Sequence, residues 1–393
     1  MSPVYYRIGI KGYRVLSSEH EDQLVVHVAP STRTKVSCPS CAGVRLRSKG
    51  RYQRQARHLD CFDVSSRLVI HGRRYRCYDC RRTFVQPLPG LLPGRRSTEP
   101  YRQRIYQQHH EGIAASSMAR IEGIGGATVS RIYSQFTRRK AAERLSLQCP
   151  LVLGIDEHTL HKGLRFATTF TDLKNHRVFD IVPGRSEADL RPYLARLQGR
   201  EKVRVVCIDL SSPYRRLIAQ CFPNAIIVAD RFHVIRLIIH HFMELVRQVA
   251  PNIKNHRGLL AALRKRPDNL TDLDRLRLHQ LFDKYPALQP LYEKMHSIRS
   301  LMNRKHQTKR QCRPLVNELL QMIDQLQASA FAPLVTLAKT LHSWQQPIAA
   351  MWRFTKNNGI TEGFHRKMKL IQRRAYGFRN FQNYRLRVIA QCG

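Results

Sequence analysis

Three short apolar runs, each ending in an aspartate, constrain the fold of this chain more than any other feature. Each is short enough to be a buried strand of an α/β sheet. Open α/β sheets carry their sites at the carboxyl ends of strands, so we expect the three acids to converge. A strand-terminal aspartate can instead cap the next helix, and this alternative stays open for Asp209, which precedes Ser-Ser-Pro. Three such acids in succession favour a shared site. The runs are Leu151–Asp156, Val203–Asp209 and Ala225–Asp230.

Further strands and helices are expected around these runs. The segments 166–170 and 177–182 predict strands, and 186–197 predicts a helix with Ser186 as its N-cap. After Asp230 no further strands are expected. Residues from about 240 to 350 predict helices, because apolar side chains recur at i, i+3 and i+4 in the stripes of a packed core.

The charge of the chain points to nucleic acid as its partner. It has 68 Lys and Arg against 28 Asp and Glu, a formal net charge of +40, while 42% hydrophobic residues are enough for sizeable cores. A folded protein that repels itself this strongly needs a polyanion to neutralise it. Acids clustered amid this charge imply a divalent cation, because bare carboxylates repel one another. Two Mg²⁺ (or Mn²⁺) ions on such acids would activate an attacking oxygen and stabilise a leaving oxygen in phosphoryl transfer.

A membrane partner and secretion are both poor fits to this sequence. No apolar run approaches the ~20 residues that span a bilayer. The first residues, MSPVYYRIGIKGYR, lack the apolar segment of a signal peptide. We therefore expect no membrane partner.

Four cysteines have the spacing of a zinc site. CPSC and CYDC are two CxxC pairs, and each pair places two sulfurs on one tight turn, so that two turns close a tetrahedron around Zn²⁺. Two disulfides or four unrelated thiols are the alternative, and the absence of a secretory signal disfavours it. Cys61 lies between the pairs as a spare or substitute ligand. The four expected ligands are Cys38, Cys41, Cys77 and Cys80.

A helix-turn-helix is expected after a Pro/Gly-rich linker at 87–94. The segment 112–121 predicts a short amphipathic helix, 122–125 a turn, and a second helix starts at Ala127. A plain helical hairpin with a solvated basic face is the alternative. The expected core is Ile113, Ile121, Ile124, Val129 and Ile132, and the expected DNA contacts are Thr128, Ser130, Arg131, Ser134, Arg138, Arg139 and Lys140.

One more acid precedes a basic amphipathic helix near the end of the chain. Asn357, Asn358 and Gly359 break the chain, Thr361 is expected to cap, and Glu362 falls in the first turn. An acid in this place can bind metal while the cations after it hold phosphates, although a Glu of a capping turn on a basic surface helix is the alternative. The expected phosphate contacts are Arg366, Lys367, Lys369, Arg373 and Arg374.

Taken together, these motifs resemble bacterial insertion-sequence transposases of the ISL-three family, which are of the DDE type with an RNase H-like catalytic core. The resemblance covers nearly the whole chain. It rests on CPSC and YRCYDCRRTF, the two predicted helices with their turn, GIDE, CIDLSSPY, ADRFHV and NNGITEGFHRKMKLIQRRAYGFRNF, in that order.

The resemblance implies a role for five residues. The three metal-binding acids of the family fall on Asp156, Asp209 and Glu362. Asp230 and His233 match a DxxH motif that supports the site in related transposases with a helical insertion. The long spacing from Asp209 to Glu362 fits such an insertion. The implied partners are the element's terminal inverted repeats and target DNA, with a homo-oligomer to bring two ends together, in a cytoplasmic, nucleoid-associated protein.

The predicted architecture is therefore multidomain α/β. The RNase H-like core, a mixed sheet with helices, is interrupted by an all-helical insertion and preceded by a zinc ribbon and a helix-turn-helix. The expected parts are a β-rich zinc ribbon at 1–90, a helix-turn-helix at 95–145, the first part of the core at 148–240, the helical insertion at 241–354 and the last part of the core, with Glu362, at 355–393.

Two other functions remain possible on the sequence alone. A non-catalytic DNA-binding regulator, such as a domesticated transposase, would use only the zinc ribbon and the helix-turn-helix, and the intact set of acids argues against it. A nuclease or resolvase of the same fold would hydrolyse branched nucleic acid without joining it. The expected end-binding domains favour a transposase.

Overall fold

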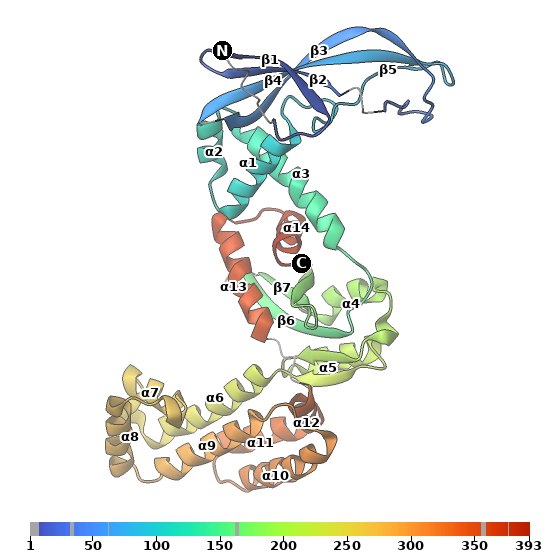
Figure 1. Ribbon diagram of the computed structural model, residues 1–393. Coiled ribbons are helices and arrows are strands. Elements are labelled where there is room, and N and C mark those ends of the chain that lie inside the picture. The colour runs from blue at the N-terminus through green and yellow to red at the C-terminus, as the bar shows by residue number, and fades with distance from the viewer. Residues whose placement is uncertain (1–7, 32–34, 62, 162–164, 355–358, 376) are drawn as a thin grey trace. The chain divides into compact units, whose positions relative to one another are not determined.

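The computed structural model describes residues 8–31, 35–61, 63–161, 165–354, 359–375 and 377–393. The chain divides into two compact units, Met1–Arg139 and Lys140–Gly393 (Figure 1). The finer division of the chain into five parts stays a prediction.

A five-stranded sheet forms the first part of the N-terminal unit. Its strand order is β1-β2-β4-β3, with β5 paired to β4. Leu24, Val26 and Val28 alternate along β2 with half-buried residues, and Leu68 and Ile70 of β4 join them in one buried cluster. This period of two is what buries one face of a sheet. The strands are β1 (Tyr13–His20), β2 (Leu24–Pro30), β3 (Leu46–Cys61), β4 (Val64–Cys77) and β5 (Thr83–Val85).

Three helices complete this unit: α1 (Glu99–Glu111), α2 (Ala115–Glu122) and α3 (Gly126–Arg144). The predicted order of helix, turn and helix is present in α2 and α3, with Gly123 left-handed between them. The predicted core is wrong in part, because Ile121 is 69% exposed and Ile113 is 37% exposed. Aromatic side chains supplied by α1 and α3 fill the core instead: Tyr101, Tyr106, Tyr133 and Phe136.

The segment predicted as a linker, 87–94, is also folded. Leu88 and Leu91 form a β-bridge with each other, and Leu91 is buried in the cluster of the sheet. The sheet and the three helices therefore belong to one compact unit.

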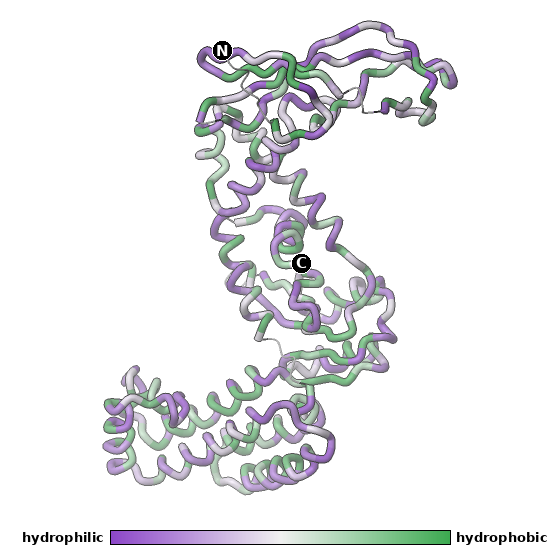
Figure 2. The backbone as a smooth tube through the Cα atoms, viewed as in Figure 1, coloured by the Kyte–Doolittle hydropathy of each residue, from purple (hydrophilic) through white to green (hydrophobic). Residues whose placement is uncertain are grey.

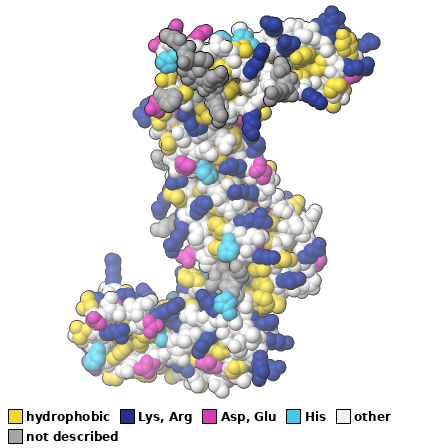
Figure 3. All heavy atoms as spheres, viewed as in Figure 1, with side chains coloured by type: hydrophobic (Ala, Val, Ile, Leu, Met, Phe, Trp, Pro, Cys, Tyr) yellow, Lys and Arg dark blue, Asp and Glu magenta, His cyan; other side chains and the backbone are white. Residues whose placement is uncertain are grey.

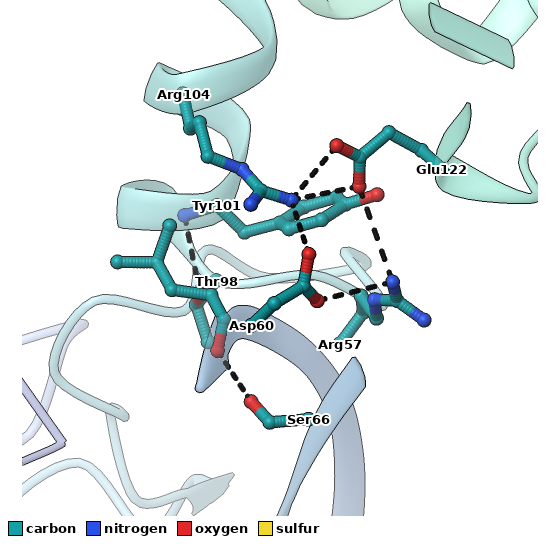
Figure 4. A network of polar contacts seen from close by, with 8 residues as sticks. Arg57, Asp60, Ser66, Thr98, Tyr101, Arg104 and Glu122 are labelled. Carbon is teal, nitrogen blue, oxygen red and sulfur yellow. Dashed lines mark hydrogen bonds and ion pairs between the residues drawn. The ribbon is translucent and has the colours of Figure 1, made fainter. Parts of the chain in front are cut away.

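A buried ion network joins the sheet to the helices of this unit (Figure 4). Arg104 of α1 donates to both oxygens of Glu122 at 2.8 Å and to Asp60 of β3 at 2.9 Å. Arg57 of β3 reaches Asp60 at 3.2 Å and Glu122 at 3.9 Å. Because the Glu122 side chain is only 4% exposed, its two cationic partners are what compensate its burial.

A mixed five-stranded sheet is the centre of the C-terminal unit. Its order is β10-β9-β6-β7-β8, with β10, β9 and β6 parallel and β7 and β8 antiparallel. Figure 2 shows hydrophobic stretches of backbone among hydrophilic ones in this unit. All four residues of β9 are apolar and buried, as expected for a strand covered on both faces. The strands are β6 (Val152–His161), β7 (Arg165–Asp172), β8 (Arg177–Pro183), β9 (Val205–Ile208) and β10 (Ile226–Ala229).

Helices account for the rest of this unit. Ser186 caps α4 with a capping box, as predicted. The helices α6 and α9–α12 share one buried cluster with the sheet, whereas α7 and α8 pack on α6 and α9 in a second cluster. Among the described residues, no helix is long and apolar enough to cross a membrane. The helices are α4 (Glu187–Arg196), α5 (Ser212–Cys221), α6 (Arg231–Val249), α7 (Arg257–Arg264), α8 (Asp272–Lys284), α9 (Leu288–Met302), α10 (Lys309–Gln327), α11 (Ala332–Ser343), α12 (Gln345–Arg353), α13 (Gly359–Arg374) and α14 (Phe381–Cys392), with short 3₁₀ turns at Arg200–Lys202, Pro251–Ile253 and Pro267–Asn269.

A buried arginine fastens the helical segment to the sheet. Arg231, the residue after Asp230, is 4% exposed. Its guanidinium donates to the carbonyl oxygens of Met302 at 3.0 Å, Arg304 at 3.1 Å and Met351 at 2.7 Å. These carbonyls follow or end α9 and α12, so one side chain satisfies three main-chain acceptors and fixes where α6 begins.

We predict that Arg231→Met lowers the free energy of unfolding by about 2–4 kcal/mol, because three buried carbonyls lose their donor. Denaturant titration followed by tryptophan fluorescence measures this, since both tryptophans, Trp344 and Trp352, are buried in the helical segment. Arg236→Met, on the exposed side of the same helix, is the control and should change stability by less than about 0.5 kcal/mol. Equal midpoints for the two variants would contradict the role given to Arg231.

Candidate active site

The register of the parallel strands places the three predicted aspartates in one row. Gly154 of β6 pairs with Cys207 of β9, and Cys207 pairs with Val228 of β10. This pairing aligns Gly154, Cys207 and Val228. Two residues after each of them comes an aspartate: Asp156, Asp209 and Asp230 respectively. Because side chains two residues apart share a face, the three carboxylates lie at one level on adjacent strands. The register thus makes the three acids neighbours, but among the described residues they do not form a group with ligand atoms within 4.8 Å of one another.

The prediction that Asp156 ends its strand is wrong. β6 continues to His161, because β7 pairs with it as far as Arg165. The parallel pairing with β9 does end at Gly154, so Asp156 lies where the sheet opens between β6 and β9.

Asp230 has both of the roles that were weighed for a strand-terminal acid. Its carboxylate caps α6 by accepting from the amide of Phe232 at 3.2 Å. It also lies 3.7 Å from Nε2 of His233, the last residue of the DxxH motif. Capping and membership of an acidic cluster are thus compatible here.

Mutual proximity changes the acidity of these carboxyls. Burial, with a smaller contribution from the neighbouring acids Asp230 and Asp209, raises the pKa of Asp156 to about 7, against the opposing effects of His233 and the amide of Glu157. Burial also raises the pKa of Asp209, with Glu157 and Asp230 adding to it. The site therefore accepts positive charge readily, as a proton or as a cation.

A polar chain that sequence reasoning missed starts at Asp156. His365 of α13 places Nδ1 3.8 Å from Oδ2 of Asp156, and its Nε2 lies 3.1 Å from the hydroxyl of Thr169. His158 lies 3.0 Å from the same hydroxyl and 2.9 Å from the hydroxyl of Tyr384. Burial lowers the pKa of His365 to about 4 and that of His158 to about 3, and the charge of Lys369 lowers both. Both imidazoles are therefore neutral at pH 7.

Glu362 takes the predicted place in the first turn of α13 but is not gathered with the aspartates. Its carboxylate pairs with Arg366 at 3.3 Å and is half exposed. In the described part of the chain, Asp156, Asp209 and Glu362 do not form a group with ligand atoms within 4.8 Å of one another. The turn that carries Glu362 is nevertheless fixed beside β7, because the hydroxyl of Thr361 donates to that of Thr171 at 3.1 Å.

Thr361 is buried inside α13 and is not the predicted N-cap. The predicted chain break at Asn357 and Asn358 lies outside the described residues. The cationic face of α13 is exposed as expected, while Met368 and Ile371 are buried on its other side. Lys367 is committed to the carbonyl of Gln391 at 2.6 Å. The exposed cations are Arg366, Lys369, Arg373 and Arg374.

A groove leads away from the acids along α6. It has a volume of about 290 Å³ and begins at Asp209 and His233. Arg236 and His240 continue it on the same side of the helix, one and two turns further on. Neither was singled out from the sequence, although their helical spacing from His233 was a usable signal.

The predicted DNA contacts of the N-terminal unit lie mostly on the outer side of α3. Ser130 and Arg131 are exposed, and Thr128 and Ser134 are half-buried, whereas Val129 and Ile132 face the core. Arg139 differs from the prediction, because it binds Glu99 at 2.8 Å and covers the ring of Phe136. Arg138 and Lys140 are exposed.

The four predicted zinc ligands come together in the N-terminal unit. Their sulfurs all lie within 4.8 Å of one another, with Cys38 and Cys80 3.5 Å apart and Cys41 and Cys77 3.6 Å apart. Zn–S bonds of ~2.3 Å in a tetrahedron place sulfurs about 3.8 Å apart, so the four thiols fit Zn²⁺. Cys61 is not in this group and lies at the end of β3 against the sheet's core.

Two family models match this chain. A zinc-finger model of the transposases of IS204, IS1001, IS1096 and IS1165 matches residues 34–80, which contain all four thiols. The transposase model of the ISL3 (ISL-three) family of DDE transposases matches residues 153–388, more than half of the chain and all of the strands and helices around the three aspartates. The chain belongs to this family. The resemblance seen in the sequence is confirmed, and the N-terminal region is a zinc ribbon.

Individual relatives agree with this assignment. The chain is 29% identical to the transposase for insertion sequence element IS1001 of Bordetella parapertussis over 97% of its own length and 96% of that protein. It is 23% identical to the transposase for insertion sequence element IS1557 of two Mycobacterium tuberculosis strains, over 65% of this chain and 62% of theirs.

We predict that purified protein contains about one zinc per chain and that Cys77→Ser/Cys80→Ser abolishes it, because two thiolates cannot close a structural site. Metal analysis measures the content directly. Cys61→Ser is the matched control and should keep its zinc, since this thiol lies outside the cluster. Zinc-free wild-type protein would contradict the assignment.

Proposed function

We propose that this family member is an active DDE transposase that binds the terminal inverted repeats of its element, cleaves a phosphodiester at each end and transfers the freed 3′-hydroxyl to target DNA. The observation that carries the proposal is the row of Asp156, Asp209 and Asp230 on three adjacent parallel strands, two of them with raised pKa values. The mixed sheet with its helical segment supports an RNase H-like core with a helical insertion.

The residues present fit a divalent cation. Oδ1 of Asp209 is buried without a hydrogen-bond partner among the described residues, and a cation would satisfy it. Asp156 and Asp209 would hold Mg²⁺ or Mn²⁺, with Glu362 completing the set from α13. Two bound ions would supply activation of the attacking oxygen and stabilisation of the leaving oxygen.

Several side chains of this unit would prepare the site for the phosphate. Neutral His365, fixed by the hydroxyl of Thr169, restrains the carboxylate of Asp156. His233 lies beside Asp230 and so couples the start of α6 to the row of acids. The exposed cations of α13 and Arg236 of the groove would attract the DNA backbone and hold its register without reading sequence.

End recognition would lie in the N-terminal unit. The zinc ribbon and a helix-turn-helix formed by α2 and α3 would present exposed Ser130 and Arg131 to the major groove. Figure 3 shows Lys and Arg side chains spread over the visible surface, with fewer acids among them. Such a surface is expected of a protein that neutralises DNA phosphates. Two ends must meet, so we propose a homo-oligomer on DNA.

We predict that Asp156→Asn lowers the rate of Mg²⁺-dependent cleavage of inverted-repeat DNA by about 100-fold or more, since several kcal/mol of charge stabilisation are lost. A nicking assay on duplexes from the element's own flanks measures the rate. End-binding should stay within about threefold, because the Lys and Arg contacts remain.

Asp324→Asn, an exposed acid on α10, is the matched control and should cleave like wild type. Undiminished cleavage by Asp156→Asn would overturn the catalytic assignment. Wild-type protein that binds ends but never nicks them would support the DNA-binding regulator instead. Cleavage without any joined product would support a nuclease.

We predict that Ser130→Ala/Arg131→Ala weakens binding to the inverted repeat by about fivefold to a hundredfold, the loss expected for one or two base contacts. The same variant should bind unrelated duplex DNA nearly as well as wild type, as measured by fluorescence anisotropy. Lys339→Ala, which removes an exposed cation of α11, is the control. An equal loss on both DNAs would show that α3 makes only phosphate contacts.

A further inference from the structure

A second cavity lies in the C-terminal unit at the edge of the sheet where β6 and β8 end and β7 begins. It has a volume of about 430 Å³, in the range of small-molecule pockets. Its walls come from these strands, from α13 and α14 and from the segment that joins the two helices. The proposed chemistry does not use it.

Aromatic and cationic groups dominate this cavity. Phe166, Phe378 and Tyr384 form part of its wall. The guanidinium of Arg185 lies 3.9 Å from the centre of the Phe166 ring, and 54% of that arginine side chain is exposed. Stacked guanidinium and aromatic planes are what proteins present to the flat face of an unpaired base.

Polar groups at the rim suit the other parts of a nucleotide. Gln372 also lines the cavity, and its side-chain amide can both donate to and accept from a base edge. Asp189 lines it too, with its Oδ2 already accepting from the amides of Arg185 and Ser186. Arg165 and Arg379 add positive charge for the attached phosphates. The cavity combines an apolar stacking surface, a polar edge and cations within one small volume.

The backbone at this cavity is held firmly. Gly184 has φ +86, and a Cβ there would lie 2.2 Å from the carboxylate of Asp189. Its amide donates to the carbonyl of Phe166 at 2.9 Å, and its carbonyl accepts from Thr168 at 2.9 Å. The wall that carries Arg185 is therefore preformed, which lowers the entropic cost of binding.

The cavity is connected to the acids by two routes. Arg185 reaches Glu157, the neighbour of Asp156, at 3.5 Å. Tyr384 ends the polar chain that runs through His158, Thr169 and His365 to Asp156. Along α13, His365 and Gln372 are about two turns, or ~10 Å, apart. At ~3.4 Å per nucleotide, this separation corresponds to two or three nucleotides.

We propose that this cavity binds one unpaired base of the DNA substrate. The base would lie two or three nucleotides from the phosphate that is cleaved beside Asp156. The placement relative to the phosphate rests on the proposed function, whereas base binding itself does not. If a DNA strand follows α13, one base would turn out of the DNA double helix and stack on Arg185. The energy of stacking would compensate the loss of pairing.

The test compares two duplexes of the same sequence, one fully paired and one with a single extrahelical 2-aminopurine. Both are bound to full-length, zinc-loaded protein without added Mg²⁺ or Mn²⁺, so that no cleavage occurs and the zinc ribbon keeps its metal. We expect about tenfold tighter binding of the bulged duplex, which corresponds to one stacked base, with quenching of its fluorescence. Arg185→Ala and Phe378→Ala should lose the preference and the quenching but keep the affinity for paired DNA.

The controls are Arg196→Ala, which removes the same charge from α4, and Phe331→Ala, which removes an exposed ring from the start of α11. Both should keep the preference. Since Arg185 is exposed, loss of folding does not explain its effect. Equal affinity of wild type for both duplexes, or an equal loss on both with Arg185→Ala, would overturn the proposal. A failure of cleavage would leave this result unchanged, because no step of the test requires it.

Discussion

The C-terminal unit depends on one constraint, which is the repulsion between carboxylates at the carboxyl ends of its parallel strands. Register alone brings Asp156, Asp209 and Asp230 to one level, and burial makes their negative charges costly. The fold offsets this cost with His233, with backbone amides and with the start of α6. Arg231 then holds that helix start against α9 and α12. The helical segment is therefore part of the support of the site, in addition to any contact it makes with DNA.

Local patterns in the sequence predicted those elements whose residue spacing alone defines them. The three apolar runs became β6, β9 and β10, and the two CxxC pairs became one cluster of thiols. Both depend on spacing along a short stretch of chain, which sequence states directly. The local pattern at Glu362 left a metal ligand and an ordinary capping-turn acid both open, and the family resemblance favoured the ligand.

Contacts across long stretches of sequence were beyond such patterns. His158 and His365 are 207 residues apart in number, and only packing of α13 on β6 shows that Thr169 joins them. Ile121 looked like core because its spacing suited a helix, but Tyr101 and Tyr106 of α1 occupy that volume. Arg139 was predicted to contact DNA, but in the structure it pairs with Glu99 of α1. In each case the deciding neighbour comes from another element.

The short parallel strands also decide how this gene can change over generations. β9 and β10 have four residues each and pair in register with their neighbours; β9 is buried throughout, and β10 is buried in its last two residues. Loss of one residue inside either strand would shift its aspartate by ~3.3 Å and turn it to the other face of the sheet. Losses in the loops before α7 or α8 would leave the row of acids intact. Copies of such a gene should therefore accumulate length differences in the helical segment, whereas a single codon lost from β9 removes Asp209 from the row of acids.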